Sequence, residues 1–205
     1  MKVVATVALA NFPLWKMCME DLRQKVDLIY VRVDGTKENK LEELQDSKLA
    51  DKIMVSQLEW NRYNWRNEML QMVDEGGGAD IVLIPDHDEI YEDTLEQDLK
   101  AFYNNGKFGK DMMMFKWFAP MPTDDGRIIP ELNGRAYPSL PHCSGFRYQP
   151  GLTYFPYCGL AMPTNYHNVP DNRYDCITKV KHYCMYTKEL EAEKKPWVMK
   201  EYGVF

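Results

Sequence analysis

The feature that most constrains the fold is an alternation of strand-like and helix-like segments over the first 118 residues. Short runs of aliphatic and β-branched residues, typical of buried strands, alternate with segments whose apolar residues recur at helical spacing. The predicted strands are 3–9, 26–33, 52–58, 79–84 and 111–118, and the predicted helices are 14–25, 38–49, 61–75 and 94–103. This alternation predicts an α/β fold with a mainly parallel sheet flanked by helices.

The second half of the chain has a different character. Residues 119–175 are rich in Pro, Gly, Asn and Tyr and show little periodicity, which predicts long irregular segments. The chain has 205 residues, of which 45% are hydrophobic, and this is enough to form the core of a single domain. We therefore expect one domain, 1–205, made of a regular half, 1–118, and a less regular half, 119–205.

Composition excludes some classes of function. The net charge of −6 argues against a sequence-independent binder of duplex DNA, which presents a basic face. No segment approaches the roughly 18 apolar residues that a membrane span requires. The five cysteines are odd in number and form no Cys-X-X-Cys pair, as expected of free thiols in a reducing compartment. We expect a cytoplasmic protein without a membrane span.

Acidic residues follow two of the predicted strands, at the edge where ligands collect in parallel sheets. Asp34 follows the second strand, and Asp86, Asp88 and Glu89 follow the strongest one. If residues 86–88 are extended, both aspartates lie on one side and His87 on the other. Carboxylate oxygens are preferred ligands of Mg²⁺ and Mn²⁺. A solvated acidic turn is the alternative, but negative charges crowded after a buried strand favour a divalent cation.

Two runs of residues resemble a known family. Asn64-Trp65-Arg66-Asn67-Glu68 lies in the predicted helix 61–75. The next predicted strand, 79–84, is followed directly by Pro85-Asp86-His87-Asp88-Glu89. This combination resembles the family 2-type glycosyltransferases of the GT-A fold, in which an Arg-Asn pair opens a helix and the next strand ends in a D-X-D metal motif. The resemblance implies a GT-A-like (Rossmann-like) sheet, with residues 1–118 binding a nucleotide sugar and residues 119–205 facing the acceptor.

The same resemblance implies individual site residues. The second strand of the family ends in an aspartate beside the nucleotide base, which is Asp34 here. The donor-binding residues expected on this basis are Ala8, Asn11, Asp34, Arg66, Asn67, Asp86 and His87. Asp86 and Asp88 are the expected ligands of Mn²⁺ or Mg²⁺. Lys179–Tyr183, followed by Thr187–Leu190, is similar to a segment whose histidine is a third ligand in one branch of the family, which implies His182, with His167 as its rival.

The catalytic base is not identified by the resemblance. Inverting members of the family carry an acidic pair in the acceptor half, and this chain has only scattered acids there: Asp124, Asp125, Glu131, Asp171 and Asp175. We take Asp86, Asp88 and Asp175 as the candidate catalytic residues. Trp117, near the end of a strand that should border the site, is a candidate for stacking on a sugar or a base.

The function that these inferences favour is a metal-dependent hexosyl- or pentosyltransferase that uses a nucleoside diphosphate sugar, a UDP-sugar by analogy. The acceptor could be a glycan, a small molecule, a protein or a modified nucleic-acid base. One alternative is a nucleotidyltransferase, although such enzymes carry a glycine-rich loop after the first strand and residues 8–13 contain no glycine. Another is a metal phosphohydrolase, which needs more histidines. A non-catalytic sugar-nucleotide-binding protein is the third.

Overall fold

The computed structural model describes residues 1–9, 14–36, 40–58, 62–105, 110–118, 142–154, 166 and 172–182. Its strands form one sheet in the order β3-β2-β1-β4-β7-β6-β8-β5. They are β1 (Val3–Leu9), β2 (Leu28–Asp34), β3 (Lys52–Ser56), β4 (Ile81–Leu83), β5 (Glu89–Tyr91), β6 (Met112–Phe118), β7 (His142–Arg147) and β8 (Arg173–His182). Among these described strands, four of the seven neighbouring pairs are parallel, so the fold is α/β with a mixed, mainly parallel sheet.

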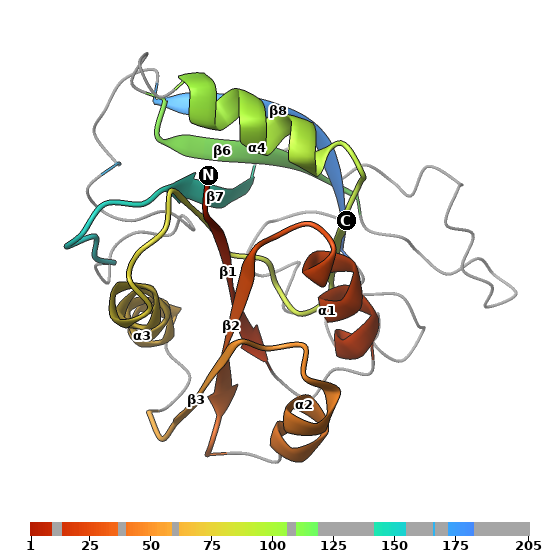
Figure 1. Cartoon of the computed structure of the whole chain (residues 1–205), viewed down its shortest axis with the longest axis vertical. Helices are drawn as coiled ribbons and strands as arrows, with labels where there is room; N and C mark the ends of the chain where they lie inside the picture. Colours follow the sequence, from red (N-terminus) through yellow and green to blue (C-terminus); the bar gives the residue numbers. More distant parts are fainter. Residues whose placement is uncertain are drawn as a thin grey trace, which may run out of the picture.

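The described helices are α1 (Trp15–Arg23), α2 (Leu41–Ser47), α3 (Arg62–Glu75) and α4 (Leu95–Asn104). Figure 1 shows α3 on one side of β1–β3 and α1 and α2 on the other, with α4 along β6 and β8. All seven residues of β1 are buried, because helices cover both faces of this part of the sheet. The odd-numbered residues of β1 pack in one core cluster with α1, α2 and α4, whereas Val4 and Ala8 pack with α3.

Three glycines end α3 and direct the chain into β4. The amide of Gly78 donates to the carbonyl of Val73 at 2.9 Å, and both Gly77 and Gly78 have positive φ, at 80° and 73°. Glycine adopts this left-handed conformation without steric cost, which explains the break in the helix. Gly76 lies so close to β2 that an added Cβ would be 2.2 Å from the hydroxyl oxygen of Tyr30. The triplet therefore sets both the direction of β4 and the packing of α3 on β2.

The predicted strands and helices of residues 1–118 are confirmed, with shifts of a few residues at their ends. The sheet differs from the prediction at β5 and β7, which were not expected and which run antiparallel to their neighbours. β7 and the start of β8 lie in the region expected to be irregular, and much of that region is outside the described residues. In the described part of the chain, no helix is long and apolar enough to cross a membrane.

Candidate donor site at the carboxyl ends of the strands

The central strands bring three of the expected donor residues, Ala8, Asp34 and Asp86, to one edge of the sheet. Ala8 of β1 lies opposite Arg32 of β2 on one side and forms a parallel bridge with Asp86 on the other. Two residues further along β2, Asp34 lies opposite Ser56 of β3. Neighbouring strands are about 4.8 Å apart, so these residues form a continuous row across four segments. Ala8 packs in the α3-side cluster, and Arg32 contacts α3, so the row lies on that face.

The residues after β4 form a turn, which corrects the expectation of an extended segment. The amide of Glu89 donates to the carbonyl of Asp86 at 3.2 Å, and the amide of Asp86 donates to Glu89 Oε2 at 3.1 Å. The hydroxyl of Tyr91 also donates to Glu89 Oε2, at 3.2 Å. Asp86 is half-buried, whereas Asp88 and Glu89 are buried. The turn arises because Glu89 supplies a side-chain acceptor to the backbone amide three residues earlier.

Tyr91 is a fixed hydrogen-bond donor at this turn. Burial raises the pKa of its hydroxyl well above the ordinary value, and the neighbouring Glu89 carboxylate raises it further. A hydrogen bond with Ser144 acts in the opposite direction and is a smaller effect. The hydroxyl therefore keeps its proton across the physiological pH range, and it can hold Glu89 in the position that caps Asp86.

His87 does not simply turn away from the site, as strict alternation would require. Its Nδ1 lies 3.0 Å from the carbonyl oxygen of Ala8. A carbonyl only accepts hydrogen bonds, so this contact assigns the proton to Nδ1. The ring thereby links the turn formed by residues 86–89, called the acidic turn below, to the end of β1. The expected contact between His87 and the donor stays a prediction, and it would have to use the rest of the ring.

Asp34 closes β2 and is almost buried, at 5% exposure. Its Oδ1 accepts from the amide of Thr36 at 2.9 Å and from the hydroxyl of Thr36 at 2.6 Å. This is the local turn that an aspartate makes with the residue two positions on. Gly35 is required here because a Cβ would lie 2.6 Å from the side chain of Gln57 and 2.9 Å from the carbonyl oxygen of Ser56. The carboxylate is thus held at the carboxyl end of the strand.

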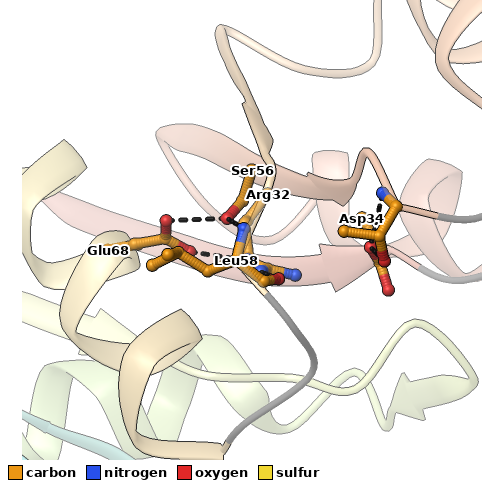
Figure 2. Close-up of polar contacts among 6 residues, drawn as sticks. Arg32, Asp34, Ser56, Leu58 and Glu68 are labelled. Carbon is orange, nitrogen blue, oxygen red and sulfur yellow. Dashed lines mark hydrogen bonds and ion pairs between the residues drawn. The ribbon is translucent and has the colours of Figure 1, made fainter.

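A buried charged network lies beside Asp34 and was not anticipated. Figure 2 shows the Glu68 carboxylate of α3 facing Ser56 and Arg32, with a dashed line to each. Arg32 Nε donates to Glu68 Oε2 at 2.8 Å, and the hydroxyl of Ser56 donates to Glu68 Oε1 at 2.7 Å. Arg32 Nη2 also donates to the carbonyl of Leu58 at 3.3 Å, and the side chain of Arg32 is fully buried. An arginine in an otherwise apolar strand was the signal in the sequence, but nothing in it identified the partner.

Arg66 and Asn67 of α3 both contact Tyr154. The Asn67 side chain donates from Nδ2 to the carbonyl of Tyr154 at 3.0 Å and accepts from its amide at 2.8 Å. The Arg66 guanidinium lies 5.2 Å from the ring centroid of Trp65 and 5.5 Å from that of Tyr154. Both residues therefore attach Tyr154 to α3. Their expected contact with the donor stays a prediction.

The late-chain candidates divide into two groups. In β8, His182 lies opposite Glu89 of β5, so its backbone is next to the acidic turn. Its side chain is outside what the structure describes, as are the side chain of Trp117 and the whole of Asn11 and His167. Asp175 is exposed and lies opposite Met114 of β6, seven residues before His182. At about 3.3 Å per residue, the structure does not bring Asp175 to the acidic turn.

The chemistry of the acidic turn fits a divalent cation. It offers carboxylate oxygens from half-buried Asp86 and buried Asp88, the ligand type that Mg²⁺ and Mn²⁺ prefer. Among the described side chains, no group of three or more His, Cys, Asp or Glu residues is arranged to hold a metal. Further ligands would therefore come from His182, from the phosphates of a donor, or from water.

No protein-family model matches this chain, and no curated protein matches it. Among solved structures, it is similar to residues 1–349 of S. aureus TarS at 19% identity over 72% of this chain and 47% of that one, with a TM-score of 0.43. The chain thus spans about half the length of that structure.

Two further structures are similar to a comparable degree. For 4-diphosphocytidyl-2C-methyl-D-erythritol synthase, the identity is 12% over 71% of this chain and 74% of that one, with a TM-score of 0.43. For mannose-1-phosphate geranyltransferase from Thermus thermophilus, it is 12% over 58% and 42%, also at 0.43. Likenesses this distant do not assign an activity to the chain.

Proposed function

We propose that this protein is a metal-dependent glycosyltransferase that uses a nucleoside diphosphate sugar. The observation that carries the proposal is the row of residues at the carboxyl ends of the strands. Asp86, Ala8 and Arg32 are successive neighbours across the sheet, and Asp34 ends the same strand as Arg32. In the proposal, an elongated ligand runs past the ends of these strands from Asp34 to Asp86, with its base at Asp34 and its diphosphate at Asp86.

The residues in this row have separate roles in the proposal. The Asp34 carboxylate accepts a hydrogen bond from the N–H edge of the base, and uracil is the default base by analogy. Asp86 and Asp88 would hold Mn²⁺ or Mg²⁺, and the ion when bound neutralises charge on the leaving diphosphate. The pairing of His182 with Glu89 supports His182 as a further ligand from the second half of the chain.

The proposed reaction exchanges one bond for another. The bond between the anomeric carbon and the diphosphate oxygen breaks, and a bond forms between that carbon and the acceptor oxygen. The acceptor hydroxyl loses its proton to a base. Asp175 is exposed and lies opposite Met114 on β8, away from the acidic turn, so the proposal does not assign it as that base.

A thermal-shift panel of sugar nucleotides with Mn²⁺ tests the proposal. A donor at about 100 times its Kd stabilises a protein by about 2.7 kcal/mol, which for a chain of this size raises Tm by about 5–10 °C. We expect one nucleoside diphosphate sugar to give such a shift only when Mn²⁺ or Mg²⁺ is present. A nucleotidyltransferase would instead respond to a nucleoside triphosphate and release pyrophosphate.

Two substitutions test whether metal-dependent turnover requires the proposed ligands, and a third is their control. Asp88→Asn is nearly isosteric and should abolish turnover of the donor while preserving the fold. Asp46→Asn, on the exposed side of α2, is a matched control and should leave turnover unchanged. Undiminished metal-dependent turnover in Asp88→Asn would refute the metal site. His182→Ala should weaken Mn²⁺-dependent turnover and narrow the difference between Mn²⁺ and Mg²⁺, because imidazole suits Mn²⁺ better.

A further inference from the structure

β8 contains a bulge that interrupts its pairing with β6. Met114 lies opposite Asp175, whereas Lys116 lies opposite Lys179. Two steps along β6 therefore correspond to four along β8, so β8 has two additional residues in this interval. A bulge of this kind removes backbone groups from the ladder, and those groups need other partners.

Asp98 of α4 supplies the missing acceptor. Its Oδ2 accepts from the amide of Thr178 at 2.8 Å and from the hydroxyl of Thr178 at 2.5 Å. Its Oδ1 accepts from the amide of Ile177 at 3.2 Å and from the hydroxyl of Tyr174 at 3.2 Å. Asp98 is only 1% exposed, so a buried carboxylate is satisfied by donors that all belong to β8.

The hydroxyl groups around Asp98 also hold the bulge against α4. Burial raises the pKa of Tyr174 to about 12, and the nearby Asp98 charge contributes to the shift, so this hydroxyl stays protonated at neutral pH. The hydroxyls of Thr94 and Thr178 are 3.1 Å apart, which adds a second link from α4 to the bulge. The contacts of Asp98 thus fix the bulge at one place along β8.

The position of the bulge determines the pairing of the residues that follow it. Beyond it, Val180, Lys181 and His182 lie opposite Tyr91, Ile90 and Glu89. The amide of Glu92 donates to the carbonyl of Lys179 at 3.1 Å at the start of this pairing. A slip of one residue would turn every side chain to the opposite face and move His182 away from Glu89.

We propose that Asp98 is a positioning residue for the metal site: by clamping the β8 bulge it fixes the register that places His182 opposite Glu89. The metal part of this inference rests on the proposed function, because it takes His182 as a ligand. Asp98 itself lies on α4, and its hydrogen bonds in the described part of the chain go to β8 and to the start of its own helix, so it acts through the strand.

Hydrogen exchange tests the register directly, without any ligand. In Asp98→Asn, an amide nitrogen replaces one acceptor and faces the donors of the bulge. We expect exchange in peptides covering 177–182 and 89–91 to become about tenfold faster or more, which corresponds to a local opening made easier by about 1.4 kcal/mol. Tyr174→Phe is the matched control, because it removes one contact of Asp98 and keeps both bulge amides bound. Unchanged exchange in Asp98→Asn would overturn the clamp.

Calorimetric titration of Mn²⁺ in the presence of UDP tests the link to the metal. Asp98→Asn should weaken Mn²⁺ binding about tenfold, the lower end of effects from supporting residues, while UDP affinity without metal is unchanged. In a His182→Ala background, Asp98→Asn should cause no further loss. A full additional loss there, or an unchanged Mn²⁺ affinity in the single variant, would refute the positioning role.

A second variant and the ligand-free exchange measurement cover two other outcomes. If Asp98→Asn does not fold, Thr178→Val removes the hydroxyl contact with Asp98 in a side chain of the same shape, and a smaller loss in the same direction is expected. If the unmodified protein binds neither UDP nor Mn²⁺, the proposed function fails and the metal role of Asp98 fails with it. The exchange experiment still decides whether Asp98 sets the register.

Discussion

The buried pair of Arg32 and Glu68 gives the sharpest prediction about stability. Arg32→Met keeps most of the side-chain volume and removes the charge. Glu68, which is 17% exposed, would keep its hydrogen bond from Ser56 and lose its cation. Removing one partner of a buried pair costs about 3–5 kcal/mol. Because Glu68 is partly exposed and keeps one donor, we expect a value near the lower end, about 3 kcal/mol.

Urea unfolding of four proteins measures this effect: the unmodified chain, Arg32→Met, Glu68→Gln and the double variant. The double variant has no unpaired charge, so it should recover about 2 kcal/mol relative to the sum of the single changes. Arg23→Met is the control, since its pair with Asp51 has side chains 36% and 31% exposed. Exposed pairs contribute about 1 kcal/mol or less. A loss below about 1 kcal/mol in Arg32→Met, or strict additivity in the double variant, would refute the reasoning.

Other predictions concern the row of residues at the carboxyl ends of the strands and the side chains that pack beside it. Asp34→Ala should weaken nucleotide binding more than it changes turnover of bound donor; equal nucleotide affinity in calorimetry would make Asp34 a turn residue only. Asn67→Ala loses two hydrogen bonds to the backbone of Tyr154 and should cost about 1–3 kcal/mol in urea unfolding. Tyr91→Phe removes the donor to Glu89 and should lower Mn²⁺ affinity without altering nucleotide affinity in the absence of metal, a split that a purely structural role would not produce.

The regular half of the chain was predictable because its signals are local. Strands such as Val3–Leu9 are continuous apolar runs, and α1 buries Trp15, Cys18, Met19 and Leu22 at helical spacing. β5 has only three residues, too few for a period to be recognised. β7 is inserted between β4 and β6, and that placement depends on contacts between residues about 60 apart in the chain, which no local pattern encodes.

The site was predictable to the same extent. Asp34 and Asp86 follow strong strands, so their common edge could be inferred from topology alone. The turn at Asp86 could not, because it depends on the side chain of Glu89 bonding a backbone amide. The pairing of Arg32 with Glu68 likewise joins residues from different elements, and many acids in the sequence could have taken that place.

The short connection from β4 to β5 has a consequence for the shape of the sheet. Leu83 and Glu89 are six residues apart, which spans at most about 20 Å when fully extended. In a flat sheet, the strands β7, β6 and β8 between them would require about 19 Å, and the turn at Asp86 shortens the reach by roughly 3 Å. The sheet must therefore curl until its far edge returns toward the end of β4. Residues 84–88 are therefore a short link between two edges of the sheet: the distance between the end of β4 and the start of β5 cannot increase by more than a few ångströms while β5 stays paired with β8.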